Sequence, residues 1–216
     1  IKEDGSFKLD MSYFRYHRGF RMTGNKFHNL FGEKPRNPEE KLCQFHMDIA
    51  ASIQFVTEEI ILKLAKSLRQ ETGMKNLCLA GGVALNCVAN GKLLEAEIFD
   101  NIWIQPASGD AGSALGAALT VWYQKNKNSR KALISDAMKG AYLGPEFSNK
   151  EIINYLKKVN APFHSLSDDN LFNMLANELD NGKVIGWFNG RMEFGPRALG
   201  NRSIIGDPRN QKMQSI

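Results

Sequence analysis

The longest periodic pattern of apolar residues lies between residues 38 and 72. Apolar side chains recur at Ile49, Ile53, Val56, Ile60 and Leu64, with a second row at Ile61, Ala65 and Leu68. This spacing of three and four residues predicts a long, largely buried helix over residues 38–68. The helix is expected to end near Thr72 and Gly73, because glycine readily adopts the left-handed conformation of a helix cap.

Two shorter units then repeat one pattern, in which a strand is followed by a glycine-bearing loop and a helix. The first comprises a strand over 76–80, the pair Gly81 and Gly82, and a helix over 83–95. The second comprises a strand over 101–105, a loop over 106–109, and a helix over 111–123. The repetition predicts an α/β fold that binds ligands at the carboxyl ends of its strands.

The flanking segments are less regular. Residues 1–40 are polar and aromatic without a period, which predicts irregular structure with a short strand, packed on another element. Residues 124–140 begin polar and basic and are predicted to be a linker, giving two domains over 1–139 and 140–216. The chain starts with Ile1 instead of Met and stops at Gln214–Ile216 without a clear end, so we expect it to be cut at both ends.

Two helices and one strand are predicted beyond residue 140. The helices cover 148–159 and 167–181, and the strand covers 183–188. Ser148 and Glu151 match the capping box that opens a helix. Asn189 and Gly190 follow the strand and predict a two-residue hairpin turn.

Composition and charge narrow the class of protein. Apolar residues make up 43% of the 216 residues, enough for a folded core. The net charge of +5 is uneven, because residues 183–216 hold six Lys or Arg and two acids, which leaves +4 there and +1 elsewhere. This local excess suits a phosphate-bearing ligand better than a nucleic acid, which usually binds a basic stripe across a domain. No apolar run is long enough to span a membrane, and a cytoplasmic protein is expected.

The cysteines and histidines carry no predicted chemistry. Cys43, Cys78 and Cys87 include no C-x-x-C pair, so buried free thiols are expected. The four histidines show no metal-ligand spacing, and no nucleophile motif is present.

Three groups of polar or glycine residues are candidates for ligand binding. Gly81 and Gly82 would allow the backbone to approach a phosphate at the start of a helix. Asn86 and Asn90, four residues apart, would share a helix face toward a ribose or base. A purely structural strand–helix junction explains the same residues equally well. Asp110 either caps the second helix or presents a carboxylate to a divalent ion.

The third group is a loop over residues 190–203 that contains Arg191, Arg197 and Arg202. Guanidinium groups bind phosphate oxygens in a bidentate manner, which favours an anionic substrate. The alternative is a solvated basic loop in which Glu193 pairs internally, within the loop. Apolar residues between the arginines favour a folded, partly buried loop.

Four segments taken together resemble the NodU/CmcH-type O-carbamoyltransferases. The resemblance lies in residues 54–59, 77–91, 104–118 and 190–203, in the order of that family, and extends from about Tyr13 to the end of the chain. It implies the second lobe of an actin-like ATPase fold (ASKHA, Kae1-like) over 1–139, followed by the beginning of a YrdC-like α/β domain over 140–216.

The resemblance also implies a reaction and its ligands. Carbamoyl phosphate and ATP would give a carbamoyl adenylate, and a hydroxyl of a small molecule or sugar would then attack the carbamoyl carbon. Gly81, Gly82, Asn86 and Gly109 match positions that hold ATP. Arg191, Arg197 and Arg202 fall in the part that binds carbamoyl phosphate.

Asp110 matches a ligand of an iron-type divalent metal, whose other ligands come from a His-x-x-x-His pair. That pair is absent from this sequence, so the chain alone is expected to be inactive. No catalytic base, acceptor or oligomeric state follows from the sequence. Two alternatives stay open at this point: a sugar-kinase-like ATPase, and a non-catalytic binding module if residue 1 is a native start. Binding to transfer RNA is a weaker third, since the first 182 residues are almost neutral.

Overall fold

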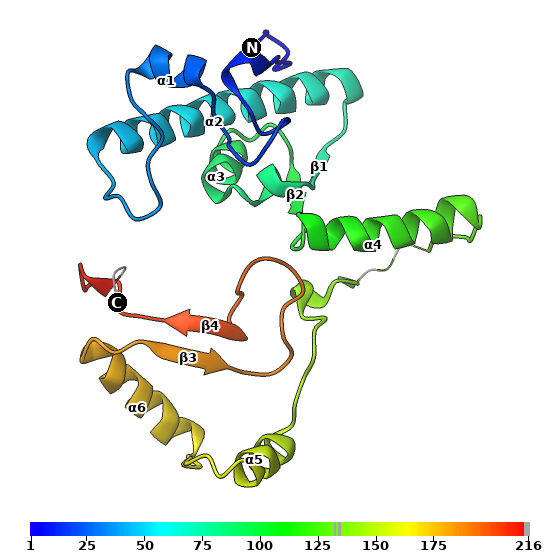
Figure 1. Cartoon of the computed structure of the whole chain (residues 1–216). Helices are drawn as coiled ribbons and strands as arrows, with labels where there is room; N and C mark the ends of the chain where they lie inside the picture. The colour runs from blue at the N-terminus through cyan, green and yellow to red at the C-terminus, as the bar shows by residue number, and fades with distance from the viewer. Residues whose placement is uncertain (132, 134, 214–216) are drawn as a thin grey trace. The chain divides into compact units, whose positions relative to one another are not determined.

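The computed structural model describes residues 1–131, 133 and 135–213 (Figure 1). The expected break at Gln214–Ile216 lies outside these residues. The chain divides into two compact units, which we describe separately. Unit 1 comprises Ile1–Cys78 and Asn86–Trp103, and unit 2 comprises Leu79–Leu85 and Ile104–Ile216.

The predicted long helix is confirmed as α2, Gln44–Thr72, which packs alongside α3, Cys87–Glu95, in unit 1 (Figure 1). The expectation that it is largely buried is wrong: within α2 only Glu58 and Ala65 are buried. It ends at Gly73, whose φ is +64° and whose N–H donates to the carbonyl of Arg69. It begins six residues later than Pro38, because Cys43 and His46 form a capping box there.

The first 43 residues are mostly irregular, as predicted. They include a 3₁₀ turn, η1 (Met11–Tyr13), and a short helix, α1 (Asn25–Phe31), which the sequence pattern did not predict. The expected strand is reduced to one bridge between Phe14 and Thr23. The segment does pack on another element, since a methyl group on Gly5 would lie 2.5 Å from the backbone nitrogen of Leu64 in α2.

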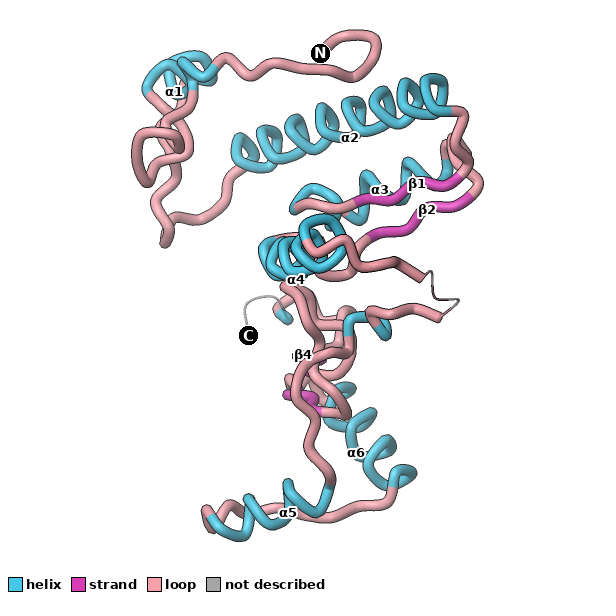
Figure 2. Tube along the Cα trace, turned by 90° about the vertical axis from the view of Figure 1, so that its right-hand side faces the viewer, coloured by secondary structure: helices cyan, strands magenta, loops and turns pink. Residues whose placement is uncertain are grey.

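Two predicted strands are present as β1, Asn76–Leu79, and β2, Asn101–Ile104, which pair with each other (Figure 2). The Asp100 N–H donates to the Lys75 carbonyl before the pair, and the Gln105 N–H donates to the Leu79 carbonyl after it. The two contacts advance in the same direction along both strands, so the pair is parallel.

The helix predicted over 83–95 is wrong as one continuous element. It is a 3₁₀ turn, η2 (Gly82–Leu85), and then α3, because Asn86 between them has extended backbone (φ −75°, ψ 92°) and caps α3. The next helix is α4, Asp110–Thr120, continued by a π-helical turn, η3 (Val121–Lys125).

Unit 2 contains the remaining elements. The capping box of Ser148 and Glu151 is confirmed, at 2.8 and 3.3 Å in its two directions. The elements that follow the 3₁₀ turn η4 (Lys139–Ala141) are α5 (Asn149–Lys158), α6 (Asp168–Asp180), β3 (Ile185–Phe188) and β4 (Arg202–Ile205).

The predicted two-residue hairpin at Asn189 and Gly190 is wrong. Strands β3 and β4 are antiparallel, with Phe188 opposite Arg202, so residues 189–201 all belong to the connection. The Asn189 N–H does bond back, to the Asn201 carbonyl at 2.9 Å, but the chain then leaves the sheet instead of turning.

Three further expectations concern the whole chain. Unit 2 runs across residue 140, and the domain boundary there stays a prediction. The expectation of buried thiols is wrong: Cys43, Cys78 and Cys87 are all exposed, at a helix cap, on a strand and at a helix start. No helix in the described part of the chain has the length and apolar character needed to cross a membrane.

Candidate functional site

Both predicted glycine loops follow the carboxyl ends of the paired strands β1 and β2. Gly81 needs to be glycine because its φ is +96°. Gly82 and Gly109 have ordinary φ values, and a Cβ on either would meet no atom within 4 Å. At Gly82 neither φ nor packing calls for glycine, whereas close approach of a ligand would. At Gly109 the backbone (φ −86°, ψ −145°) lies outside the helical and extended regions, a conformation that glycine adopts more readily than other residues. Their assignment to ATP stays a prediction.

Asn86 caps α3 instead of lying on the face of a helix beside Asn90, so that part of the prediction is wrong. Its side-chain oxygen accepts from the Ala89 N–H at 3.1 Å and from Nε2 of Gln54 at 3.2 Å. Its amide nitrogen donates to Oε1 of Gln54 at 2.8 Å. A nucleotide role for Asn86 is untested, and these contacts already supply a structural role.

A partly buried polar network continues from Asn86 into α2. Gln54 also donates to Glu58 at 2.7 Å, and Glu58, which is 6% exposed, forms an ion pair with Lys92 of α3. The hydrogen bond from Lys92, followed by that from Gln54, lowers the pKa of Glu58 below its ordinary value. The four-residue spacing of Gln54 and Glu58 in a helix was the signal in the sequence that could have indicated this network. The network joins α2 to α3.

We predict that Asn86→Ala destabilises the protein without a specific loss of nucleotide binding. Loss of an N-cap costs about 1 kcal/mol, and for a domain of this size 1 kcal/mol lowers the Tm by roughly 2–4 °C. Asn86→Asp is the matched control, because Asp accepts the Ala89 N–H equally well but cannot donate to Gln54. Thermal denaturation and ATP titration of both variants check this. Weakened ATP binding in a stably folded Asn86→Asp variant would instead favour the nucleotide role.

Asp110 is the first residue of α4, and the N-cap is Gly109. Asp110 makes no side-chain cap hydrogen bond there, so the expectation that it caps the helix is wrong. Its exposed carboxylate lies in the first turn, where negative charge complements the helix dipole. Within the described ranges, no three His, Cys, Asp or Glu side chains cluster around a possible metal position. A single carboxylate does not hold a metal, so these residues do not fit a complete metal site.

The loop before Asp110 is partly buried. Ala107 is fully buried, and its N–H donates to Oε1 of Gln105 at 3.1 Å. Ser108 is 5% exposed, and its hydroxyl has no hydrogen-bond partner among the described residues. Ser108 was not predicted from the sequence, because one serine in a glycine-bearing loop carries no distinctive signal.

The loop over residues 190–203, here called the arginine loop, pairs with an earlier segment through backbone hydrogen bonds. The Phe194 N–H donates to the Ala141 carbonyl at 2.6 Å. The Met192 N–H donates to the Pro145 carbonyl, and the Gly144 N–H donates to the Met192 carbonyl, both at 2.9 Å. The arginine loop is therefore a folded structure, as the sequence analysis expected.

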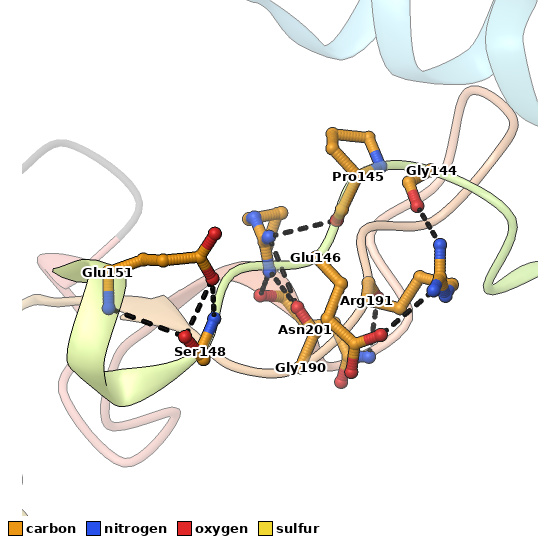
Figure 3. Close-up of polar contacts among 9 residues, drawn as sticks. Gly144, Pro145, Glu146, Ser148, Glu151, Gly190, Arg191 and Asn201 are labelled. Atoms are coloured by element: carbon orange, nitrogen blue, oxygen red, sulfur yellow. Dashed lines mark hydrogen bonds and ion pairs between the residues drawn. The ribbon is translucent and has the colours of Figure 1, made fainter.

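Two of the three arginine side chains form hydrogen bonds within the protein. Arg191 donates to the Gly144 carbonyl at 2.8 Å and to the Glu146 carboxylate at 2.9 Å (Figure 3). Arg202 donates to several carbonyls, including that of Gly190 at 3.2 Å, and its guanidinium carbon lies 3.4 Å from the centre of the Phe188 ring. Both side chains hold backbone in place.

Arg197 differs from the other two. It is exposed, and the structure gives its guanidinium no hydrogen bond or ion pair to any described residue. Of the three predicted anion-binding arginines, Arg197 therefore keeps all of its donors for a ligand. The sequence could not separate the three, because all lie in the same polar, glycine-bearing segment.

Glu193 pairs within its own loop, as the alternative expected, but its partners are backbone N–H groups and no arginine side chain among the described residues forms an ion pair with it. Glu193 is 6% exposed and accepts backbone N–H groups from Leu199 at 2.7 Å, Asn201 at 2.8 Å and Arg202 at 3.3 Å. These bonds, that from Asn201 foremost, lower its pKa to about 2 against the opposing effect of burial. The carboxylate is thus ionised at neutral pH.

The arginine loop contacts the second glycine loop within unit 2. Gly195 has a φ of +137°, and a Cβ there would lie 3.2 Å from both Cα and Cβ of Ala107. Ala107 precedes Gly109 and Asp110 by two and three residues. Two motifs that are far apart in the sequence are thus in contact, as expected if both contribute to one site.

Comparison with known proteins gives two family matches. The family described as Carbamoyltransferase N-terminus matches residues 1–119. The family described as Carbamoyltransferase C-terminus matches residues 176–216. The arginine loop lies in the second match and the two glycine loops lie in the first.

Three curated relatives illustrate the similarity. Protein sll1178 of Synechocystis sp., which is uncharacterised, is 59% identical over 100% of this chain and 35% of its own length. Nodulation protein NolO of Bradyrhizobium diazoefficiens is 44% identical over 77% of this chain and 30% of its own length. Nodulation protein U of Sinorhizobium fredii is 32% identical over 77% of this chain and 28% of its own length. The chain spans about a third of the length of these relatives.

Proposed function

Because the chain belongs to the carbamoyltransferase family, we propose that it carries part of the active site of an O-carbamoyltransferase. The matches confirm the resemblance to NodU-type proteins. The observation that supports a shared site is the contact of Gly195 with Ala107, because it joins the arginine loop to the loop of Gly109 and Asp110. The secondary structure is α/β, and the finer assignment to Kae1-like and YrdC-like parts belongs to this proposal.

The proposed substrates are carbamoyl phosphate, ATP and a small hydroxyl-bearing acceptor. Arg197 is proposed to bind the phosphate of carbamoyl phosphate, since its guanidinium is exposed and has no partner among the residues that the structure describes. The open backbone at Gly82 and Gly109 is proposed to approach the phosphates of ATP. The buried Ser108 hydroxyl supports this loop as a ligand site, because an unpaired buried hydroxyl is costly unless something completes its hydrogen bond.

The residues of this chain would act by binding and positioning. Arg197 would orient carbamoyl phosphate and stabilise charge on the phosphate that leaves, and the glycine loops would hold ATP. Carbamoyl phosphate, ATP and water would together give carbamoyl adenylate, phosphate and pyrophosphate. The acceptor hydroxyl would then attack the carbamoyl carbon as AMP leaves. We assign no catalytic base. Asp110 would supply at most one ligand to a divalent metal.

The relatives contain long regions outside the match, so the complete reaction is proposed to need more than these residues. The comparisons do not favour the two alternatives, a sugar-kinase-like ATPase and a non-catalytic binding module.

The test is carbamoyl transfer by the full-length gene product, followed as AMP formation that depends on carbamoyl phosphate and a hydroxyl acceptor. We predict that Arg197→Ala raises the KM for carbamoyl phosphate. A charge-assisted hydrogen bond contributes about 1.5–3 kcal/mol, and 1.4 kcal/mol is tenfold, so the increase should be about 10- to 100-fold. ATP turnover independent of carbamoyl phosphate would contradict the proposed function.

Arg209→Ala is the matched control for loss of one exposed arginine. Arg209 pairs with Asp180 and Asp207 and lies outside the arginine loop, so the KM should stay within about twofold of the wild-type value. An equal rise in the KM for both variants would indicate a general effect of surface charge instead of a contact with substrate.

A further inference from the structure

The carboxylate of Glu193 accepts hydrogen bonds from residues six to nine positions later in its own loop. Its Oε1 atom accepts the backbone N–H groups of Leu199, Asn201 and Arg202, at 2.7, 2.8 and 3.3 Å. Hydrogen bonds from N–H to an ionised carboxylate are stronger than those to a neutral oxygen, and burial strengthens them further. These bonds enclose residues 194–198, and we call the arrangement the Glu193 clasp.

Arg197 lies within the segment that the clasp encloses. Pro196 restricts the backbone just before it, and Gly195 contacts Ala107 one residue earlier. The Arg197 guanidinium has no partner in the described part of the protein, so no side-chain contact fixes its direction. The backbone conformation of the enclosed segment therefore determines where Arg197 extends from the surface.

The rest of the arginine loop is held by other bonds. Backbone hydrogen bonds join Met192 and Phe194 to residues 141–145, and the side chain of Asn201 donates to the Arg191 carbonyl at 2.7 Å. Neither set includes the Glu193 carboxylate. Removing the carboxylate should therefore loosen residues 195–198. Leu199 and Asn201 would keep their bonds to Tyr142 and Arg191, and the attachment to residues 141–145 would stay in place.

We propose that Glu193 is a positioning residue, whose clasp holds the backbone so that Arg197 is presented to an anionic substrate. This inference rests on the proposed function, in which that anion is the phosphate of carbamoyl phosphate. Glu193 itself is buried and faces backbone, so it acts through Arg197 and makes no contact with substrate.

The test is a double-mutant cycle in the full-length gene product. Glu193→Ala should raise the KM for carbamoyl phosphate about tenfold with a smaller change in kcat, since it misplaces one charge-assisted contact. In the Arg197→Ala background the same substitution should have no further effect, because the residues are coupled. If the increases in KM caused by the two single substitutions multiply in the double variant, the inference is overturned.

Two further variants separate positioning from support of the fold. Glu193→Gln keeps an oxygen that accepts the three N–H groups and should recover most of the wild-type KM. Glu151→Ala is the matched control, because Glu151 also accepts a backbone N–H, from Ser148 at 2.8 Å (Figure 3). It should lower the Tm and leave the KM unchanged. Loss of folding in both Glu193 variants would overturn the inference, since the carboxylate would then be a requirement of the fold.

Hydrogen exchange gives a readout independent of turnover. In Glu193→Ala, the amides of Leu199 and Asn201 should exchange faster, while those of Met192 and Phe194 stay protected. An active wild type with an unchanged KM in Glu193→Ala would overturn this inference alone. A wild type without carbamoyl phosphate-dependent activity would overturn it together with the proposed function.

Discussion

Gly112→Ala is expected to destabilise the protein although alanine is the better helix former. A methyl group at residue 112 would lie 2.0 Å from the carbonyl oxygen of Ala107, which is buried and cannot move away freely. Overpacking of this kind costs up to about 3 kcal/mol, against about 1 kcal/mol gained in helix propensity. The net loss of about 2 kcal/mol should lower the Tm by roughly 4–8 °C.

Gly116→Ala is the control for Gly112→Ala. Gly116 lies one turn later in α4, and a methyl group there would meet no atom within 4 Å. It should raise the stability by up to about 1 kcal/mol, since only the propensity changes. Thermal denaturation of the two variants checks that Gly112→Ala lowers the Tm and Gly116→Ala raises it. A Tm for Gly112→Ala equal to that of Gly116→Ala would contradict the close contact with Ala107.

Gly195→Ala is expected to lower both the stability of the protein and its transferase activity. At a φ of +137°, a non-glycine residue is strained by about 1–3 kcal/mol, and the added methyl would press on Ala107 at 3.2 Å. The arginine loop should therefore separate from the loop that precedes Asp110. Displacement of Arg197 should reduce kcat/KM for carbamoyl phosphate about tenfold or more, in proportion to the loss of one charge-assisted contact.

Gly186→Ala is the matched control for Gly195→Ala. Gly186 lies in β3 with an ordinary φ and with open space around the position of a Cβ. Its kcat/KM should stay close to the wild-type value. If Gly195→Ala retains full activity, the contact between the two loops has no part in the proposed site.

Local patterns in the sequence predicted most of the helices. The apolar periodicity of α2 and the capping box of α5 depend on residues only three or four apart, so the sequence contains all the information they need. The same holds for Gly73, which ends α2. The prediction of one continuous helix over 83–95 failed at Asn86, because an asparagine within a helical pattern can equally cap a new helix.

The hairpin prediction failed for a different reason. Asn189 and Gly190 have suitable residue types for a tight turn, and Gly190 does adopt a φ of +50°. The following residues find backbone partners in residues 141–145, and these bonds outweigh the local turn preference. The sequence around Glu193 shows only that a charged residue lies between two apolar ones, Met192 and Phe194. It does not show that its carboxylate binds three backbone N–H groups.

By itself, the sequence determined the family, the α/β order of elements, and the residue types of the candidate site: two glycine loops, an aspartate and three arginines. Only the tertiary structure decided how the arginines differ. Arg191 bonds to the carbonyl of Gly144, 47 residues away, and Arg202 bonds to backbone and stacks on Phe188, whereas Arg197 has no hydrogen-bond or ion-pair partner among the described residues. The physical reason is that a side chain's hydrogen-bond partners are set by the fold, whereas its donors are set by its residue type.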